Sequence, residues 1–139
     1  MKTRFSSLVT IKKSAMQKSE RVVQSANADL NSALVALEIS RNSLHDISSP
    51  QSGMMSSFLA SRKLLDSGRS LITHNQEWVN YAKNQLNLAK EELNKSMIEY
   101  EKFNYLELEE IKKILYKQKL QESKELDEVA LLTHTRKHT

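Results

Sequence analysis

The sequence predicts an all-α fold, a long two-helix antiparallel coiled-coil hairpin in which the second helix overhangs the first. Apolar residues recur at every seventh position in two ladders, helix-breaking residues are scarce, and the single proline lies between the ladders. A strict seven-residue repeat keeps one stripe on one side of a helix, and two such helices wind around each other. The first ladder consists of Val9, Met16, Val23, Leu30, Leu37 and Leu44. The second consists of Phe58, Leu65, Ile72, Val79, Leu86, Leu93 and Tyr100.

The composition favours long helices and argues against an enzyme. The chain has 139 residues but only two glycines and one proline, so there is almost no turn chemistry for strands. Two packed helices bury a stripe rather than a broad core, and a rod offers no obvious concave pocket for small-molecule chemistry. The absence of cysteine excludes disulfides, thiol catalysis and thiolate metal sites. We therefore expect one coiled-coil domain over residues 1–139, without a catalytic site or a cofactor.

The first helix is expected over about residues 5–47. Beside its apolar ladder runs a second seven-residue register that is mostly small or polar, namely Phe5, Lys12, Ser19, Ala26, Ala33, Ser40 and Ile47. The turn is expected at about residues 48–53, which hold both a proline and a glycine, because a proline disrupts a helix interior by about 3 kcal/mol. A turn at residues 66–70, around Gly68, is the alternative.

The second helix is expected over about residues 54–132, followed by a frayed tail at 133–139. Its second register is again mostly small, with Asn75, Ala82, Ala89, Ser96 and Phe103. Beyond Tyr100 we expect the ladder to lose its phase. Glu107 occupies the next ladder position, while Leu108, Ile111 and Leu115 mark a shifted stripe.

A turn centred near residue 51 predicts which residues face each other. Val9 would then lie opposite Leu93, and Leu44 would lie opposite Phe58. Phe5 would pair with residues near 97, so that the chain from about residue 98 to 132 overhangs. A lone helix with that much apolar surface is not expected to stay bare in water. We infer a partner surface there, for another copy of the chain or for a different protein.

The charge is uneven along the chain. The net charge is +4, but residues 1–28 carry six basic residues and one acidic residue, whereas residues 91–139 carry nine basic and eleven acidic residues. Charge complementarity between the two helices is the simplest interpretation, and an acidic or phosphate-bearing partner of the basic stretch is the alternative. No apolar run is long enough to span a membrane, and none follows the basic start, so we expect a cytoplasmic protein.

Two further groups of residues invite a functional interpretation. His134 and His138 have the i,i+4 spacing of metal ligands, but they lie in the expected tail without a third ligand, so we predict no metal site. Trp78 and Tyr81 lie near the ladder residue Val79, and we interpret them as core or seam residues rather than as a binding site.

Both ends of the chain resemble the FliJ family of flagellar export proteins. The N-terminal match is Met1-Lys2-Thr3-Arg4-Phe5, then Leu8, Ile11 and Lys12, with Met16 and Glu20 following. The C-terminal match is the stretch Glu122 to Ala130, which contains Lys124, Asp127 and Glu128, followed by Arg136 and Lys137. The size, the basic character and the expected hairpin are similar to the family over the whole chain.

The resemblance implies a component of the flagellar type III protein export apparatus, and so a role in flagellum biogenesis, motility and chemotaxis. It implies a stalk-like coiled coil that binds the export ATPase ring, contacts the export gate membrane protein and handles export chaperones. It also implies a cytoplasmic protein that associates peripherally with the inner face of the cell membrane through its partners. Candidate ATPase-binding residues are Phe5, Leu8, Ile11, Lys12, Leu126, Asp127, Glu128 and Arg136. Candidate gate-binding residues are Leu44, Ile47, Phe58 and Leu65.

Two other functions stay open on the sequence. A generic self-associating coiled-coil scaffold or type III secretion chaperone would hide the overhang in a stable dimer. A nucleic-acid-binding helical arm would use the basic N-terminal stretch and bind with a steep dependence on salt, although we expect no nucleic-acid partner.

Overall fold

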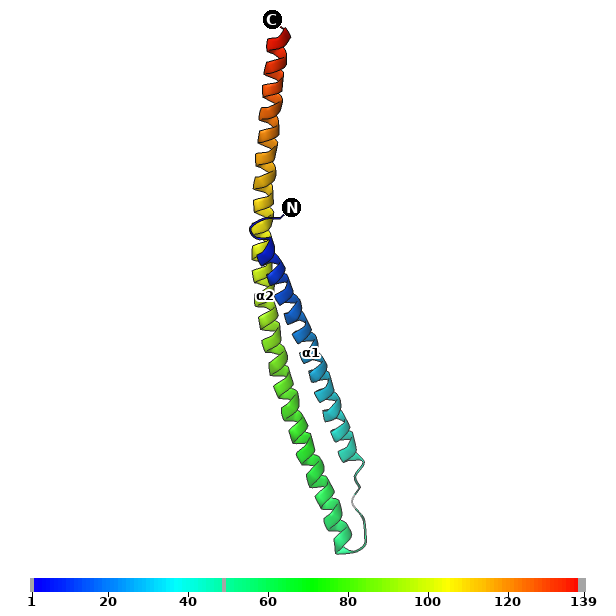
Figure 1. Cartoon of the computed structure of the whole chain (residues 1–139). Coiled ribbons are helices and arrows are strands. Elements are labelled where there is room, and N and C mark those ends of the chain that lie inside the picture. Colours follow the sequence, from blue (N-terminus) through cyan, green and yellow to red (C-terminus); the bar gives the residue numbers. More distant parts are fainter. Residues whose placement is uncertain (1, 49, 138–139) are drawn as a thin grey trace. The chain divides into compact units, whose positions relative to one another are not determined.

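Two helices make up nearly all of the structure. The computed structural model describes residues 2–48 and 50–137. Helix α1 spans Ser6–His45 with 40 residues, and helix α2 spans Met55–Lys137 with 83 residues (Figure 1). Within the described ranges no residue belongs to a strand. The predicted all-α fold of two long helices is confirmed.

The connection between the helices covers residues 46–54 and contains Pro50 and Gly53. Gly53 has a φ of +137°, a conformation that favours glycine, and it precedes the start of α2 by two residues. Residues 66–70, the alternative place for the turn, lie inside α2. Ser49, which belongs to the predicted turn, lies outside the described residues.

Helix α2 continues past Leu132, where the sequence analysis ended it, to Lys137. The Thr133 hydroxyl donates to the carbonyl oxygen of Val129 at 2.8 Å, and the Thr135 hydroxyl donates to that of Leu131 at 2.9 Å. Hydroxyls that bond the preceding turn in this way are compatible with helix. The expected frayed tail is therefore helical as far as the description reaches, and positions 138 and 139 lie outside it.

The helices form two compact units. We call residues 17–95 the middle unit, and residues 1–16 together with 96–139 the terminal unit. In the middle unit Leu44 lies against Gly68, while the earlier residue Ala36 contacts the later residue Asn75. The two helical stretches of this unit therefore run antiparallel, as predicted.

The core of the middle unit is small and formed from both helices. Ala33 and Leu37 of α1 pack with Val79 and Ala82 of α2, and all four are at most 5% exposed. Every position of the two predicted registers within α1 is buried or half-buried. The seven-residue pattern thus identified the buried stripe of α1 correctly, whereas the first ladder residue of α2, Phe58, is exposed.

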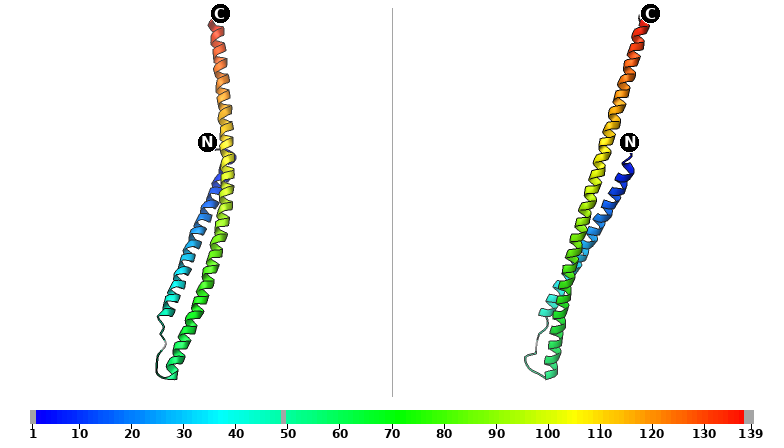
Figure 2. Two further views of the ribbon diagram at one scale, coloured as in Figure 1. Left: turned by 180° about the vertical axis from the view of Figure 1, so that it is seen from behind. Right: turned by 90° about the vertical axis from the view of Figure 1, so that its left-hand side faces the viewer.

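The facing of the two helices differs from the prediction. Leu44 lies against Gly68 and not against Phe58, which shifts the pairing ten positions along α2. A Cβ added to Gly68 would come within 2.9 Å of the Leu44 Cδ1 atom. The predicted pairing was wrong because it assumed that the two helices extend equally from the middle of the connection, near residue 51. In the structure, the connection instead runs alongside the first turns of α2 (Figures 1 and 2).

Large residues face small ones in this arrangement. The ladder residue Val79 packs with Ala33 of the small register of α1, and Leu44 packs with Gly68, which precedes Asn75 in the small register of α2. The predicted facing would have set large residues against large and small against small. Alternating large and small residues across a seam fills it evenly at close approach, whereas the other facing leaves crowded and empty layers in turn.

In the terminal unit the start of α1 packs against α2 in the same antiparallel sense. The Ser6 hydroxyl donates to Glu107 Oε1 at 2.8 Å, and Lys12 Nζ lies 3.6 Å from Glu99 Oε2. Glu107 therefore keeps the ladder position and faces α1. Leu108 and Leu115 are 51% and 50% exposed. The apolar ladder ends after Tyr100, and a hydroxyl on α1 satisfies the carboxylate that takes the next seam position. The expected change of winding stays a prediction.

The overhang of α2 is shorter than expected. The contact between Arg4 and Glu110, at 3.7 Å, lies at the end of the zone in which the structure pairs the two helices. Residues 98–110, which the sequence analysis counted as overhang, thus lie beside α1. From Leu115 onward every residue up to Arg136 is exposed, and no other element accompanies this stretch in the terminal unit (Figures 1 and 2).

Candidate partner-binding surfaces

The first candidate surface is the N-terminal end of α1, which polar contacts hold in place. The Thr3 backbone N–H donates to Ser6 Oγ at 2.8 Å, and the Phe5 N–H donates to Thr3 Oγ1 at 3.1 Å. Side chains that accept free N–H groups at a helix start stabilise it. The Arg4 guanidinium lies 4.9 Å from the centre of the Phe5 ring. Phe5 is consequently half-buried and fixed rather than freely presented.

The other N-terminal candidates differ in how well they are presented. Ile11 is 60% exposed and Leu8 is 39% exposed, so both apolar side chains are open to a partner. Ile11 also borders an open hollow on the helix surface. Lys12 is half-buried, and its ammonium lies 5.5 Å from the centre of the Phe103 ring as well as beside Glu99. Lys12 therefore contributes chiefly to the packing of α1 on α2.

The second candidate surface is the C-terminal stretch of α2. A shallow groove there is lined by Glu122, Glu125, Leu126 and Val129, which lie three or four residues apart on one face. Leu126 and Val129 are 70% and 58% exposed. The groove offers an apolar pair bordered by two carboxylates, a surface that suits apolar and basic side chains. Leu126 is the most exposed apolar side chain among the predicted ATPase-binding residues.

The structure does not bring the two groups of candidates together. Asp127, Glu128 and Arg136 are exposed, on the same stretch as Leu126 but outside the lining of its groove. The α1 end reaches α2 at Glu110, and sixteen further residues of helix separate that point from Leu126, or roughly 24 Å. A partner that contacts both groups must therefore extend along the terminal unit.

The four candidates for gate binding also divide. Leu44 and Ile47 are half-buried. Their Cδ1 atoms lie 2.9 Å and 4.0 Å from the position that a Cβ atom would take if Gly68 had a side chain, so both residues belong to the packing between the helices. Phe58 and Leu65 line an open surface groove together with Ser61, Arg62, Asp66 and Arg69. Phe58 is 39% exposed. Only the α2 members of this group are placed to meet a partner.

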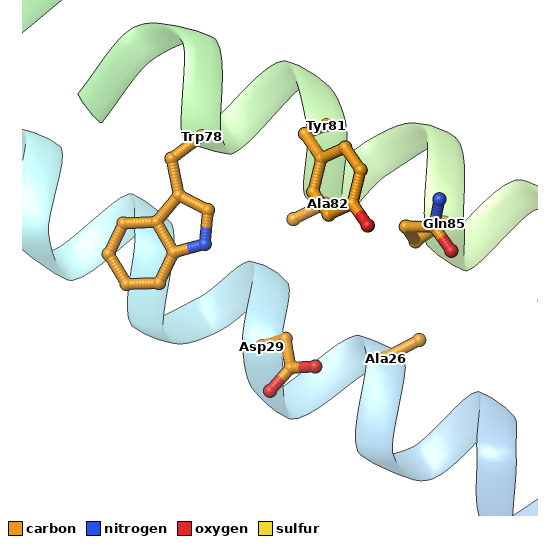
Figure 3. Close-up of a pocket in the computed structure, with 6 residues that line it drawn as sticks. All are labelled: Ala26, Asp29, Trp78, Tyr81, Ala82 and Gln85. Carbon is orange, nitrogen blue, oxygen red and sulfur yellow. The ribbon is translucent and has the colours of Figure 1, made fainter. Parts of the chain in front are cut away.

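One surface was missed in the sequence analysis. Trp78 and Tyr81 are 39% and 63% exposed, so they are not core residues. Each directly precedes a buried seam residue, Val79 or Ala82, and so flanks the seam on one side. They line a groove with Ala26 and Asp29 of α1 and with Ala82 and Gln85 of α2 (Figure 3). Their one-residue offset from the two registers was the signal that could have identified them.

Two kinds of functional feature are not found in the described part of the chain. Residues 2–48 and 50–137 contain no cluster of three or more metal-binding side chains, and His138 lies outside this range. No helix within the same ranges is long and apolar enough to cross a membrane.

The comparison with known families agrees with this arrangement. The family described as Flagellar FliJ protein matches residues 1–139, the whole length of the chain. No curated protein and no solved structure shows significant similarity to the chain. A match over every residue of the sequence is far more extensive than the two terminal motifs that first indicated the resemblance. The chain belongs to the FliJ family of flagellar proteins, which are components of flagellar protein export.

Proposed function

We propose that the chain is a non-enzymatic, stalk-like component of the export apparatus that binds the export ATPase ring and promotes its assembly and activity. The observation that carries the proposal is the exposed C-terminal stretch of α2 in the terminal unit, which projects beyond α1 with its apolar residues uncovered. A ring offers a central opening that can surround a helix on all sides. A stretch that is exposed on every face suits such an environment.

The surfaces of the terminal unit support specific contacts with the ATPase. Leu126 and Val129 supply the apolar anchor, and Glu122 and Glu125 beside them favour basic side chains of the partner. Ile11 and Leu8 supply a second apolar contact on α1. The polar contacts at Ser6 and Thr3 hold that end of α1 on α2, so the second contact is presented at a fixed place.

The test replaces the apolar anchor with charges. In the variant Leu126→Glu with Val129→Lys, we expect ATPase binding to weaken by about tenfold or more, because charges replace the buried anchor of the interface. The stimulation of ATP hydrolysis should fall with it. Helical content, measured by circular dichroism, should stay unchanged because both residues are exposed.

The matched control makes the same kind of change elsewhere. Val35 and Ile39 lie on α1 in the middle unit and are 55% and 59% exposed. The variant Val35→Glu with Ile39→Lys should bind and stimulate the ATPase like the wild type. Equal losses in both variants, or an unmodified chain that neither joins the ATPase nor raises its turnover, would contradict the proposal.

The proposal extends to the export gate and the export chaperones, which would place the chain peripherally at the inner face of the membrane. Phe58 is the most accessible of the candidates that line the groove near the start of α2. Phe58→Ala should weaken binding to the cytoplasmic part of the gate. Its neighbour Leu59, which is 54% exposed, provides the control Leu59→Ala. Equal effects of the two changes would argue against a specific role for Phe58.

A further inference from the structure

The C-terminal part of α2 carries a stripe with an unusual order of residues, all of them exposed except Ile111, which is half-buried. The stripe consists of Leu108, Ile111, Leu115, Lys119, Glu122, Leu126 and Val129. Successive members are three or four residues apart, so they share one face of the helix. The apolar members Leu115, Leu126 and Val129 are 50%, 70% and 58% exposed. We call this face the 108–129 stripe.

The centre of the stripe is complementary to itself when reversed. A single lysine followed by a single glutamate lies there, and Leu115 and Leu126 lie four residues away on either side. When a second copy is laid alongside in the opposite direction, Lys119 falls opposite Glu122 of that copy, and Leu115 falls opposite its Leu126. In a parallel arrangement Lys119 would instead face its own equivalent, which is repulsive.

We propose that the 108–129 stripe pairs with the same stripe of a second copy of this chain, antiparallel, about a two-fold axis between Leu120 and Gln121. The charge pattern favours a second copy over an unrelated protein, because one lysine and one glutamate at the centre match themselves only in reversed order. About this axis the stripes of the two copies overlap over residues 112–129, so that Leu115 and Leu126 form two symmetric apolar layers and Val129 falls opposite Lys112. Lys112 would lie near Asp127 of the second copy on the flank of the same seam.

This inference does not depend on the proposed function, because it concerns the chain alone. The pairing covers Leu126 and Val129, the residues offered to the ATPase. One consequence does rest on the proposed function: self-association and ATPase binding exclude each other, so that the chain enters the ATPase complex only as the paired stripes separate.

The first experiment reverses the central charges in the full-length chain. Self-association is measured by sedimentation over a range of concentrations, for Lys119→Glu alone, for Glu122→Lys alone and for their equimolar mixture. Each variant alone places like charges opposite each other at two symmetric positions, so its self-association should weaken by about tenfold or more. The mixture should recover the wild-type association, because both contacts between the two variants are again of opposite sign.

The controls reverse charges away from the stripe. Lys117 and Glu128 lie on the opposite face of the same helix by the helical repeat. Lys117→Glu and Glu128→Lys should associate like the wild type. The proposal is overturned by a wild-type chain that stays monomeric up to its highest soluble concentration, by equal effects of the controls, or by a mixture that associates no better than its components.

The second experiment tests the direction of pairing. The chain has no cysteine, so single cysteines can be placed at will. Leu115 and Leu126 are eleven residues apart, or roughly 16 Å along the helix, whereas a disulfide joins Cα atoms within about 7 Å. Under oxidation, Leu115→Cys mixed with Leu126→Cys should crosslink, and neither variant should crosslink to itself. Crosslinking of each variant to itself, or of none, contradicts antiparallel pairing.

Discussion

The facing of large against small residues can be tested by exchanging a buried pair. Val79 and Ala33 are 1% and 0% exposed and pack in one cluster from opposite helices. Val79→Ala removes two buried methyl groups at about 0.8 kcal/mol each and leaves a cavity, so it should lower the free energy of unfolding by about 2–3 kcal/mol. Ala33→Val overpacks a closed site and should lower it by about 1–3 kcal/mol.

The double variant decides whether the two sites share one layer. With both changes the summed volume of the pair is restored, so the loss should be at least about 1.5 kcal/mol smaller than the two single losses together. Urea unfolding followed by circular dichroism measures all four proteins. Additive losses would refute the pairing of Val79 with Ala33. The facing predicted from the sequence places Ala33 opposite position 69, and it gives no reason for the two sites to compensate.

Three further changes test individual contacts. Asn75→Ala removes the hydrogen bond from the amide to the Ala36 carbonyl at 3.1 Å and should lower stability by about 1 kcal/mol, measured as a lower melting temperature. Gly68→Val crowds Leu44, because the new Cβ atom alone would lie 2.9 Å from the Leu44 Cδ1 atom. It should cost about 1–3 kcal/mol in urea unfolding. Ser6→Ala removes the bond to the seam carboxylate, and amide exchange in the first turns of α1 should quicken while global stability changes by under about 1 kcal/mol.

The sequence was sufficient to predict which face of each helix is buried. A seven-residue period depends only on the local geometry of one helix, so the positions of both registers could be read directly. The position of one helix along the other depends on the fit between two surfaces. Steps of seven keep ladder against ladder, whereas the observed shift of ten, which is seven plus three, sets each ladder against the small register of the other helix, and both arrangements keep the seam apolar. The small residues at 33 and 68 favour the observed step, and the sequence analysis treated such residues only as weak seam formers.

The candidate site was predictable to a lesser degree. The exposed C-terminal stretch with Leu126 was anticipated, because no length of α1 could cover it. Trp78 and Tyr81 were assigned to the seam because they adjoin Val79, although a shift of one residue turns a side chain by about 100° around a helix. Leu44 and Ile47 were chosen for the gate because they end the first ladder. In the structure the same apolar character makes them pack toward Gly68.

The order of the seam also explains where partners can bind. Interlocked large and small residues close the centre of the middle unit, where Trp78 and Tyr81 flank the seam without entering it. In the terminal unit the seam closes with the polar contact of Ser6 with Glu107 and the ion pair of Arg4 with Glu110. Because these last contacts between α1 and α2 are polar, the apolar seam does not continue onto the exposed stretch of α2. The apolar residues beyond this point begin a new stripe on a different face, so a partner can cover them without competing with α1.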